Sequence, residues 1–69
     1  MDFIQRMNVW QQYVGKKVFL RTKNNRIYIG VVKAVDSSTI PLHFLHLLTK
    51  ENYSVIIVHY EIVEIKEEM

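Results

Sequence analysis

The chain has no cysteine, one proline and two glycines among its 69 residues. The lack of cysteine excludes disulfide bonds and thiolate metal sites. Because glycine and proline are scarce and 49% of the residues are hydrophobic, the composition excludes a disordered or low-complexity chain. A domain this small, without covalent or metal staples, often gains buried area by self-association. We therefore expect one domain spanning residues 1–69 that forms a homo-oligomer.

Long apolar segments are absent as well. No run approaches the roughly 20 apolar residues that span a bilayer, and no signal-peptide pattern opens the chain. We therefore expect a cytoplasmic protein with no membrane partner.

Net charge is low, at +2, but the charges are unevenly distributed. Residues 1–36 carry seven basic and two acidic side chains, which gives +5, whereas residues 37–69 carry two basic and five acidic side chains, which gives −3. One interpretation is an anion-binding face in the first half of the chain. The other, which we favour, is ordinary solvated strand edges or head-to-tail attraction between neighbouring subunits.

The N-terminal segment has the apolar spacing of an amphipathic helix. Intervals of four, three and four residues separate its apolar side chains, namely Phe3, Met7, Trp10 and Val14. Asp2 is placed to cap such a helix and Gly15 to end it. We predict a helix over residues 3–14, in which Trp10 belongs to the core and does not serve as a stacking platform for a base.

After Gly15 the apolar period changes to two, which predicts strands. Five short segments are predicted as strands and are separated by turns: residues 16–22, 26–36, 42–48, 53–58 and 62–66. Asn24 and Asn25 tolerate the positive φ of a tight hairpin turn. The order of elements predicts a mainly β fold, with an N-terminal helix followed by a small, closed or nearly closed barrel over residues 16–66.

Gly30 lies inside the most β-branched of these segments. Glycine in a strand interior costs conformational entropy and packs nothing. A five-stranded barrel must curve sharply, and glycine suits a bend at a barrel corner. We predict that the strand bends at Gly30.

This pattern resembles the Sm-like (LSm) family, whose members fold as an N-terminal helix and a five-stranded, strongly bent SH3-like barrel. The matching positions are the opening strand of the first Sm motif, the spacing of its hallmark residues, one core position and the closing strand. In this chain they are Gly15, Val18 and Leu20, then Arg26, Gly30 and Asp36, then Val32, and finally residues 62–65. The resemblance covers residues 3–66.

The chain departs from the family at its uridine pocket, which uses an aromatic residue or His and an Asn after the Asp, and an Arg-Gly pair near the end of the fourth strand. Ser38 and Pro41 fall near the first two positions once one inserted residue is allowed, and they supply neither a stacking ring nor an amide. Val58 and His59 replace the Arg-Gly pair. The bacterial Hfq branch also carries a His at the position of His59, which keeps a base contact open. We favour the alternative of a corner histidine.

Three basic residues, Arg21, Lys23 and Arg26, flank one predicted hairpin and are the expected phosphate contacts. Together with Ser38 and His59 they form the candidate RNA-binding set. Binding would come from cation–phosphate contacts multiplied around a ring, with little base readout. The alternative is a structural or protein-interaction ring with no nucleic-acid role, which the missing pocket residues and low net charge favour.

The resemblance also implies a hexameric or heptameric ring, in which the fourth strand of one subunit pairs with the fifth strand of the next. Residues 53–58 show almost no alternation, so we expect both faces of that strand to be buried. An unprotected edge this apolar would invite aggregation. Phe19, Ile27 and Ile29 place apolar groups where the family usually has polar ones. They lie under the helix or form a contact between the faces of two rings.

No combination of residues indicates catalysis. His43 and His46 are three residues apart on a predicted strand, so they point to opposite faces and cannot share a metal. The serines lack any motif that would activate them as nucleophiles. We therefore predict a binding protein that is not an enzyme and that uses no metal, no cofactor and no small-molecule substrate.

Overall fold

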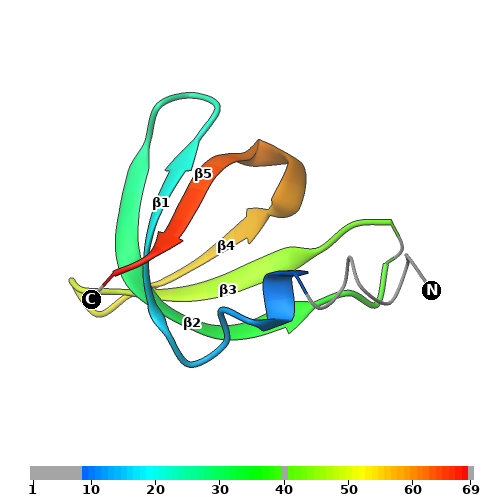
Figure 1. Cartoon of the computed structure of the whole chain (residues 1–69), viewed down its shortest axis with the longest axis horizontal. Helices are drawn as coiled ribbons and strands as arrows, with labels where there is room; N and C mark the ends of the chain where they lie inside the picture. The colour runs from blue at the N-terminus through cyan, green and yellow to red at the C-terminus, as the bar shows by residue number, and fades with distance from the viewer. Residues whose placement is uncertain (1–8, 40, 69) are drawn as a thin grey trace.

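Five antiparallel strands form the fold (Figure 1). The structure is a computed structural model and describes residues 9–39 and 41–68. The strands are β1 (Lys17–Thr22), β2 (Ile27–Asp36), β3 (Phe44–Thr49), β4 (Ser54–Val58) and β5 (Ile62–Glu67), and the 3-10 turn η1 (His59–Glu61) joins β4 to β5. Each predicted strand agrees with an observed one to within two residues at either end. The mainly β class and the strand positions are therefore confirmed.

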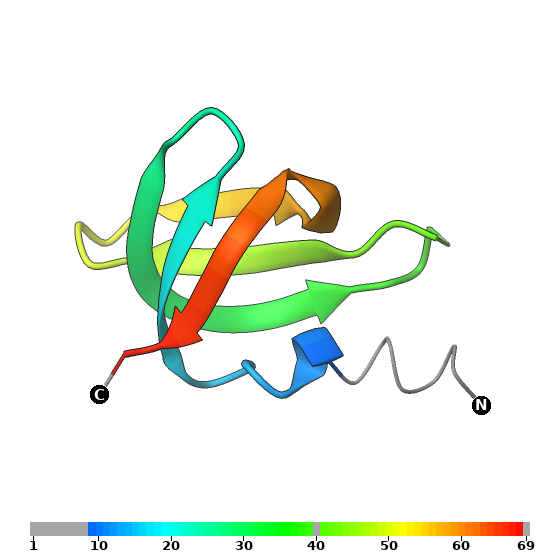
Figure 2. The same cartoon turned by 45° about the horizontal axis from the view of Figure 1, so that its top comes forward.

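The strands are arranged in the order β4-β3-β2-β1-β5, so the last two strands of the chain form the two edges of the sheet. The long strand β2 holds the sheet together. Its residues 27–31 pair with β1, and its residues 30–36 pair with β3, with a register shift between Val32 and Ala34. Figure 2 shows β2 curving through the middle of the sheet as it passes from one partner to the other. Within the described part of the chain, no ladder joins β4 to β5.

The core lies on the concave side of this bent sheet. Its buried hydrophobic side chains come from the first four strands and alternate along them: Val18, Leu20, Val32, Leu45, Leu47 and Ile57. Trp10 and Tyr13 are half-buried and pack against this core. Trp10 thus contributes to the core, as its position on the apolar stripe predicts.

Gly30 is the residue at which β2 is paired with both neighbours, Val18 on β1 and Thr49 on β3. A Cβ atom at this position would lie 2.2 Å from the carbonyl oxygen of Leu48 and 2.8 Å from the Cα atom of Thr49. Glycine is required because the β3 backbone fills the space that any side chain would need. The close approach of the β3 backbone is thus a reason for glycine that the structure adds to the bend predicted from the sequence.

The predicted helix over residues 3–14 is wrong for residues 12–14. Residues 3–8, and the Asp2 cap, lie outside the described residues, and only residues 9–11 are helical. Val14 instead forms a parallel bridge with Val32, and the Gly15 N–H donates to the Val32 carbonyl at 2.7 Å. These long-range bonds satisfy the backbone groups that further helical turns would have used, and Gly15, at φ 85°, turns the chain toward β1.

The two tight turns between strands each contain an asparagine with positive φ. Asn25 has φ 67° in the β1–β2 turn, which confirms the prediction from its side chain, and Asn52 has φ 73° in the β3–β4 turn. Across residues 9–39 and 41–68, none of the helical segments has the length and apolar character needed to cross a bilayer.

Candidate nucleic-acid interface

The five residues predicted to contact RNA fall into two groups in the structure. Arg21, Lys23 and Arg26 lie on or beside the β1–β2 turn, and we call this set the basic hairpin. Ser38 follows the other end of β2, and His59 begins η1. The ten-residue strand β2 separates the basic hairpin from Ser38, so the five residues do not form one site.

Within the basic hairpin, Arg21 is the residue with a charged partner. Its Nε atom lies 3.2 Å from Oε1 of Glu64 on β5, and both side chains are partly exposed. Such an exposed pair contributes only about 0–1 kcal/mol to stability, but it neutralises the charge that a phosphate would contact. Of the three side chains, Arg21 is therefore the least available to an anion.

Lys23 and Arg26 are exposed. The Lys23 ammonium lies 5.6 Å from the centre of the Tyr60 ring, and the Lys23 backbone N–H donates to the Glu61 carbonyl at 2.8 Å. These contacts hold the hairpin against η1. The cationic groups of Lys23 and Arg26 form no ion pair with a described carboxylate, so they are better placed than Arg21 to contact phosphate.

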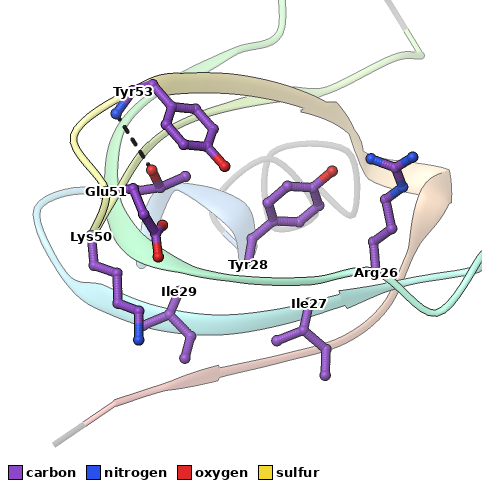
Figure 3. Close-up of a pocket in the computed structure, with 8 residues that line it drawn as sticks. Arg26, Ile27, Tyr28, Ile29, Lys50, Glu51 and Tyr53 are labelled. Atoms are coloured by element: carbon purple, nitrogen blue, oxygen red, sulfur yellow. Dashed lines mark hydrogen bonds between the residues drawn. The ribbon is translucent and has the colours of Figure 1, made fainter.

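Arg26 also borders a hollow of about 470 Å³ between β2 and the β3–β4 turn (Figure 3). We call it the tyrosine hollow, because Tyr28 and Tyr53 extend into it. The Arg26 guanidinium lies at one end, and Lys50 and Glu51 lie at the other. The hollow thus combines two phenol rings with two cations and one carboxylate.

Tyr28, Tyr53 and Lys50 were not predicted from the sequence as site residues. Tyr28 reads as an ordinary strand residue and Tyr53 as the first residue of the next apolar segment. The pairing of Gly30 with Thr49 brings the start of β2 beside the β3–β4 turn. Nothing in the local pattern specifies that register, because a shift of two residues preserves the alternation of faces.

A second, smaller hollow of about 280 Å³ shares Arg26 and Tyr28 with the tyrosine hollow. It is bordered by Thr22 and Asn24 from the hairpin region and by residues of β4, including Ile56 and Val58. It therefore occupies the open side of the sheet, between the hairpin and the free edge of β4.

Ser38 forms its hydrogen bonds within its own loop. Its backbone N–H and its hydroxyl both donate to Oδ1 of Asp36, at 3.0 and 2.7 Å. These hydrogen bonds, the one from the hydroxyl foremost, hold the pKa of the Asp36 carboxyl below its ordinary value. Because the carboxylate remains charged beside it, we expect Ser38 to make no phosphate contact.

His59 lies at a corner, between β4 and β5, and contacts a second histidine. Its backbone N–H donates to the His43 carbonyl at 2.7 Å, and its Nδ1 atom accepts a hydrogen bond from the His43 N–H at 3.2 Å. The rings of Trp10 and Tyr60 lie with their centres 6.2 and 5.8 Å from that of His59. One imidazole nitrogen is thus occupied within the fold, and Nε2 is the atom left for any ligand.

His43 itself is buried, 8% exposed, and its Nδ1 lies 2.8 Å from the Ser37 hydroxyl. Burial lowers the pKa of His43, and the neighbouring His59 lowers it further. In the part of the chain that the structure covers, no cluster of three or more potential ligand side chains could hold a metal ion.

Phe19, Ile27 and Ile29 point to the convex face of the sheet, away from the ring of Tyr28 (Figure 3 labels Ile27 and Ile29). Ile27 and Ile29 also border the tyrosine hollow. Ile27 is 56% exposed. Lys66 on β5 places its ammonium 5.2 Å from the centre of the Phe19 ring. Because Ile27 is open to solvent among the described residues, a contact between the faces of two oligomeric rings stays an expectation for this face.

No family model, no curated protein and no solved structure matches the chain. The Sm-like resemblance therefore stays a prediction from the sequence. Function has to be argued from the residues of the site, because a fold can host many functions.

Proposed function

We propose that the protein is a divergent Sm-like protein with a bent SH3-like barrel that binds single-stranded RNA through cations and aromatic rings with little base specificity. The observation that carries this proposal is Arg26 beside Tyr28 and Tyr53 in the tyrosine hollow. Proteins that bind single strands without sequence preference combine a basic groove with aromatic rings on which bases stack. The exposed Lys23 extends the basic surface along the same hairpin.

The same proposal includes a homo-oligomeric ring of hexameric or heptameric size. Because β4 and β5 are the two edges of the sheet, each leaves a row of backbone groups without a strand partner among the described residues. The fifth strand of a second copy can pair with β4 and cover Ile56, which is 61% exposed. A ring repeats Lys23 and Arg26 in every subunit, so weak individual contacts add up through multivalency.

Oligo-uridine is expected to bind no better than oligo-adenine or oligo-cytidine of equal length. The physical reason is that stacking on tyrosine accepts any base, and phosphate contacts carry no sequence information. Fluorescence anisotropy with labelled strands, between about 50 and 200 mM salt, should show affinity falling steeply as counterion release predicts. A uridine preference of about tenfold or more that is lost in His59→Ala would show instead that a base pocket survives at His59.

Charge reversal in the basic hairpin is expected to weaken binding to all three strands alike. For single strands, each phosphate contact contributes about 0.7 to the slope of log affinity against log salt. Lys23→Glu and Arg26→Glu should each reduce that slope. The matched control is Lys33→Glu, an equal charge change at an exposed position in the other half of β2. If Lys33→Glu loses as much affinity as the hairpin variants, only net charge matters and the hairpin makes no specific contact.

Tyr53 separates stacking from charge in the same assay. Tyr53→Ala removes a half-exposed ring and should lower affinity roughly tenfold, the low end of what one stacked base contributes, while Tyr53→Phe keeps the ring and should bind as the parent does. If both variants bind normally, the hollow takes no base.

The second candidate function is a structural or protein-interaction ring. The observation that favours it is the apolar convex face, where Ile27 is 56% exposed and adjoins Phe19 and Ile29. Absence of binding to every strand at low salt would select this candidate over RNA binding.

A further inference from the structure

The pairing of β3 with β4 ends in an unusual way at His43 and His59. Phe44 is paired with Val58, so His43 and His59 would form the next pair of the ladder. The His59 N–H does donate to the His43 carbonyl, at 2.7 Å. The reciprocal backbone acceptor is not available, because the His59 carbonyl accepts the N–H of Ile62 at the end of η1.

The side chain of His59 takes the place of that carbonyl. The His43 N–H donates to its Nδ1 atom at 3.2 Å. We call this hydrogen bond the His59 latch. Nδ1 can accept only while it carries no proton, so the latch requires the neutral imidazole with its hydrogen on Nε2. A proton on Nδ1 would turn the acceptor into a donor that faces another donor.

No group around the latch stabilises a protonated imidazole. The His43 ring is buried and lies with its centre 5.2 Å from that of His59. The other groups that face the pair are the Ser37 hydroxyl, the Trp10 ring and the Tyr60 ring of η1. Among residues 9–39 and 41–68, neither imidazole forms an ion pair, and this includes Glu61 on η1. A positive charge on either ring would therefore repel the other without gaining a carboxylate partner.

We propose that the His59 latch is an acid-sensitive device that releases the junction of β3, β4 and η1, and the Trp10 segment packed on it, when His59 is protonated. The proposal does not depend on RNA binding. The direction of the pH effect follows from which state binds more protons. Burial lowers the pKa of His43 in the closed state. The Nδ1 atom of His59 cannot take up a proton while it accepts the His43 N–H, so opening the latch creates a site that a proton can occupy. The opened state therefore binds more protons than the closed state. The stabilisation is complete above the ordinary value of 6.5 and is lost as the pH falls below it.

Amide hydrogen exchange can follow the latch directly, because its donor is a backbone N–H. We take the ratio of the protection factor of the His43 amide to that of the Leu45 amide, a core residue of the same strand. Protonation of the His43 ring would destabilise the whole fold and lower both protection factors. Opening of the latch lowers the protection factor of the His43 amide alone. From about pH 7.5 to 5 the ratio should fall by up to about tenfold per pH unit below the relevant pKa. Fluorescence of Trp10, the single tryptophan, should change in parallel because its neighbour moves.

Two variants make the test specific. His59→Asn can place its amide oxygen near the position of Nδ1 and accept the same hydrogen bond without titrating, so its ratio should stay constant with pH. His46→Gln removes the remaining histidine, which lies on β3 and is paired with Ile56 of β4, three residues from His59, and should behave as the parent does. A constant ratio in the parent protein, or an equal fall in His59→Asn, would overturn the proposal.

Discussion

Gly30→Val should lower the free energy of unfolding by about 3 kcal/mol or more, because overpacking alone costs about 1–3 kcal/mol and backbone cannot easily yield. The first atom of any side chain at this position would lie 2.2 Å from the Leu48 carbonyl oxygen. Either β2 or β3 has to move, and Gly30 is paired with both β1 and β3, so the disturbance spreads across the sheet. Thermal and urea denaturation followed by circular dichroism would measure the loss. In a domain of this size, about 3 kcal/mol corresponds to a fall in Tm of roughly 12 to 24 °C.

The other glycine provides the control. Gly15 has φ 85°, but no atom lies within 4 Å of the position of its Cβ. Gly15→Ala therefore tests only the left-handed backbone, which costs roughly 1–2 kcal/mol for a residue with a side chain. Gly30→Ala adds the smallest side chain at the close approach and should cost more than Gly15→Ala. Equal costs would mean that β2 and β3 do not approach as closely in solution.

Local patterns were sufficient to predict the strands of this chain. Short apolar segments bounded by turn residues located all five, and Asn25 indicated the turn before β2 through its tolerance of positive φ. The same reasoning failed for residues 12–14. Their apolar spacing continues that of a helix, but Val14 pairs with Val32, 18 positions further along the chain. A tertiary partner overrode the local preference, and no local pattern contains that information.

In the candidate site, too, some features follow from local sequence and others depend on tertiary pairing. The basic residues of the hairpin are adjacent in the chain and could be named from it. The tyrosine hollow depends on the register of β2 against β3, and the role of His59 depends on η1 withdrawing its carbonyl from the ladder. Gly30 is intermediate, because its presence predicts that something special happens in β2, while the Leu48 carbonyl that requires it is known only from the fold.

The outer edge of β4 is the place where assembly can be tested without unfolding the subunit. Hydrogen bonds join the residue pairs His43–His59 and Thr49–Tyr53 at the two ends of the β3–β4 ladder. In an antiparallel ladder, hydrogen-bonded and non-hydrogen-bonded pairs alternate. Ile56, which is paired with His46, is therefore a non-hydrogen-bonded position, and its N–H points away from β3 toward the free edge.

Ile56→Pro is accordingly expected to convert the proposed ring to a folded monomer. Proline removes the donor that a neighbouring strand would need, while every hydrogen bond to β3 remains, and edge strands tolerate proline in this orientation. Light scattering at micromolar concentration should find about 50 or 58 kDa for a hexamer or heptamer of the parent chain and 8.3 kDa for the variant. Ile56→Thr, which keeps the N–H and the β-branch, should still assemble, and circular dichroism should show that all three chains are folded. A monomeric parent would exclude the ring, and an Ile56→Pro variant that assembles like the parent would place the contact between subunits elsewhere than the β4 edge.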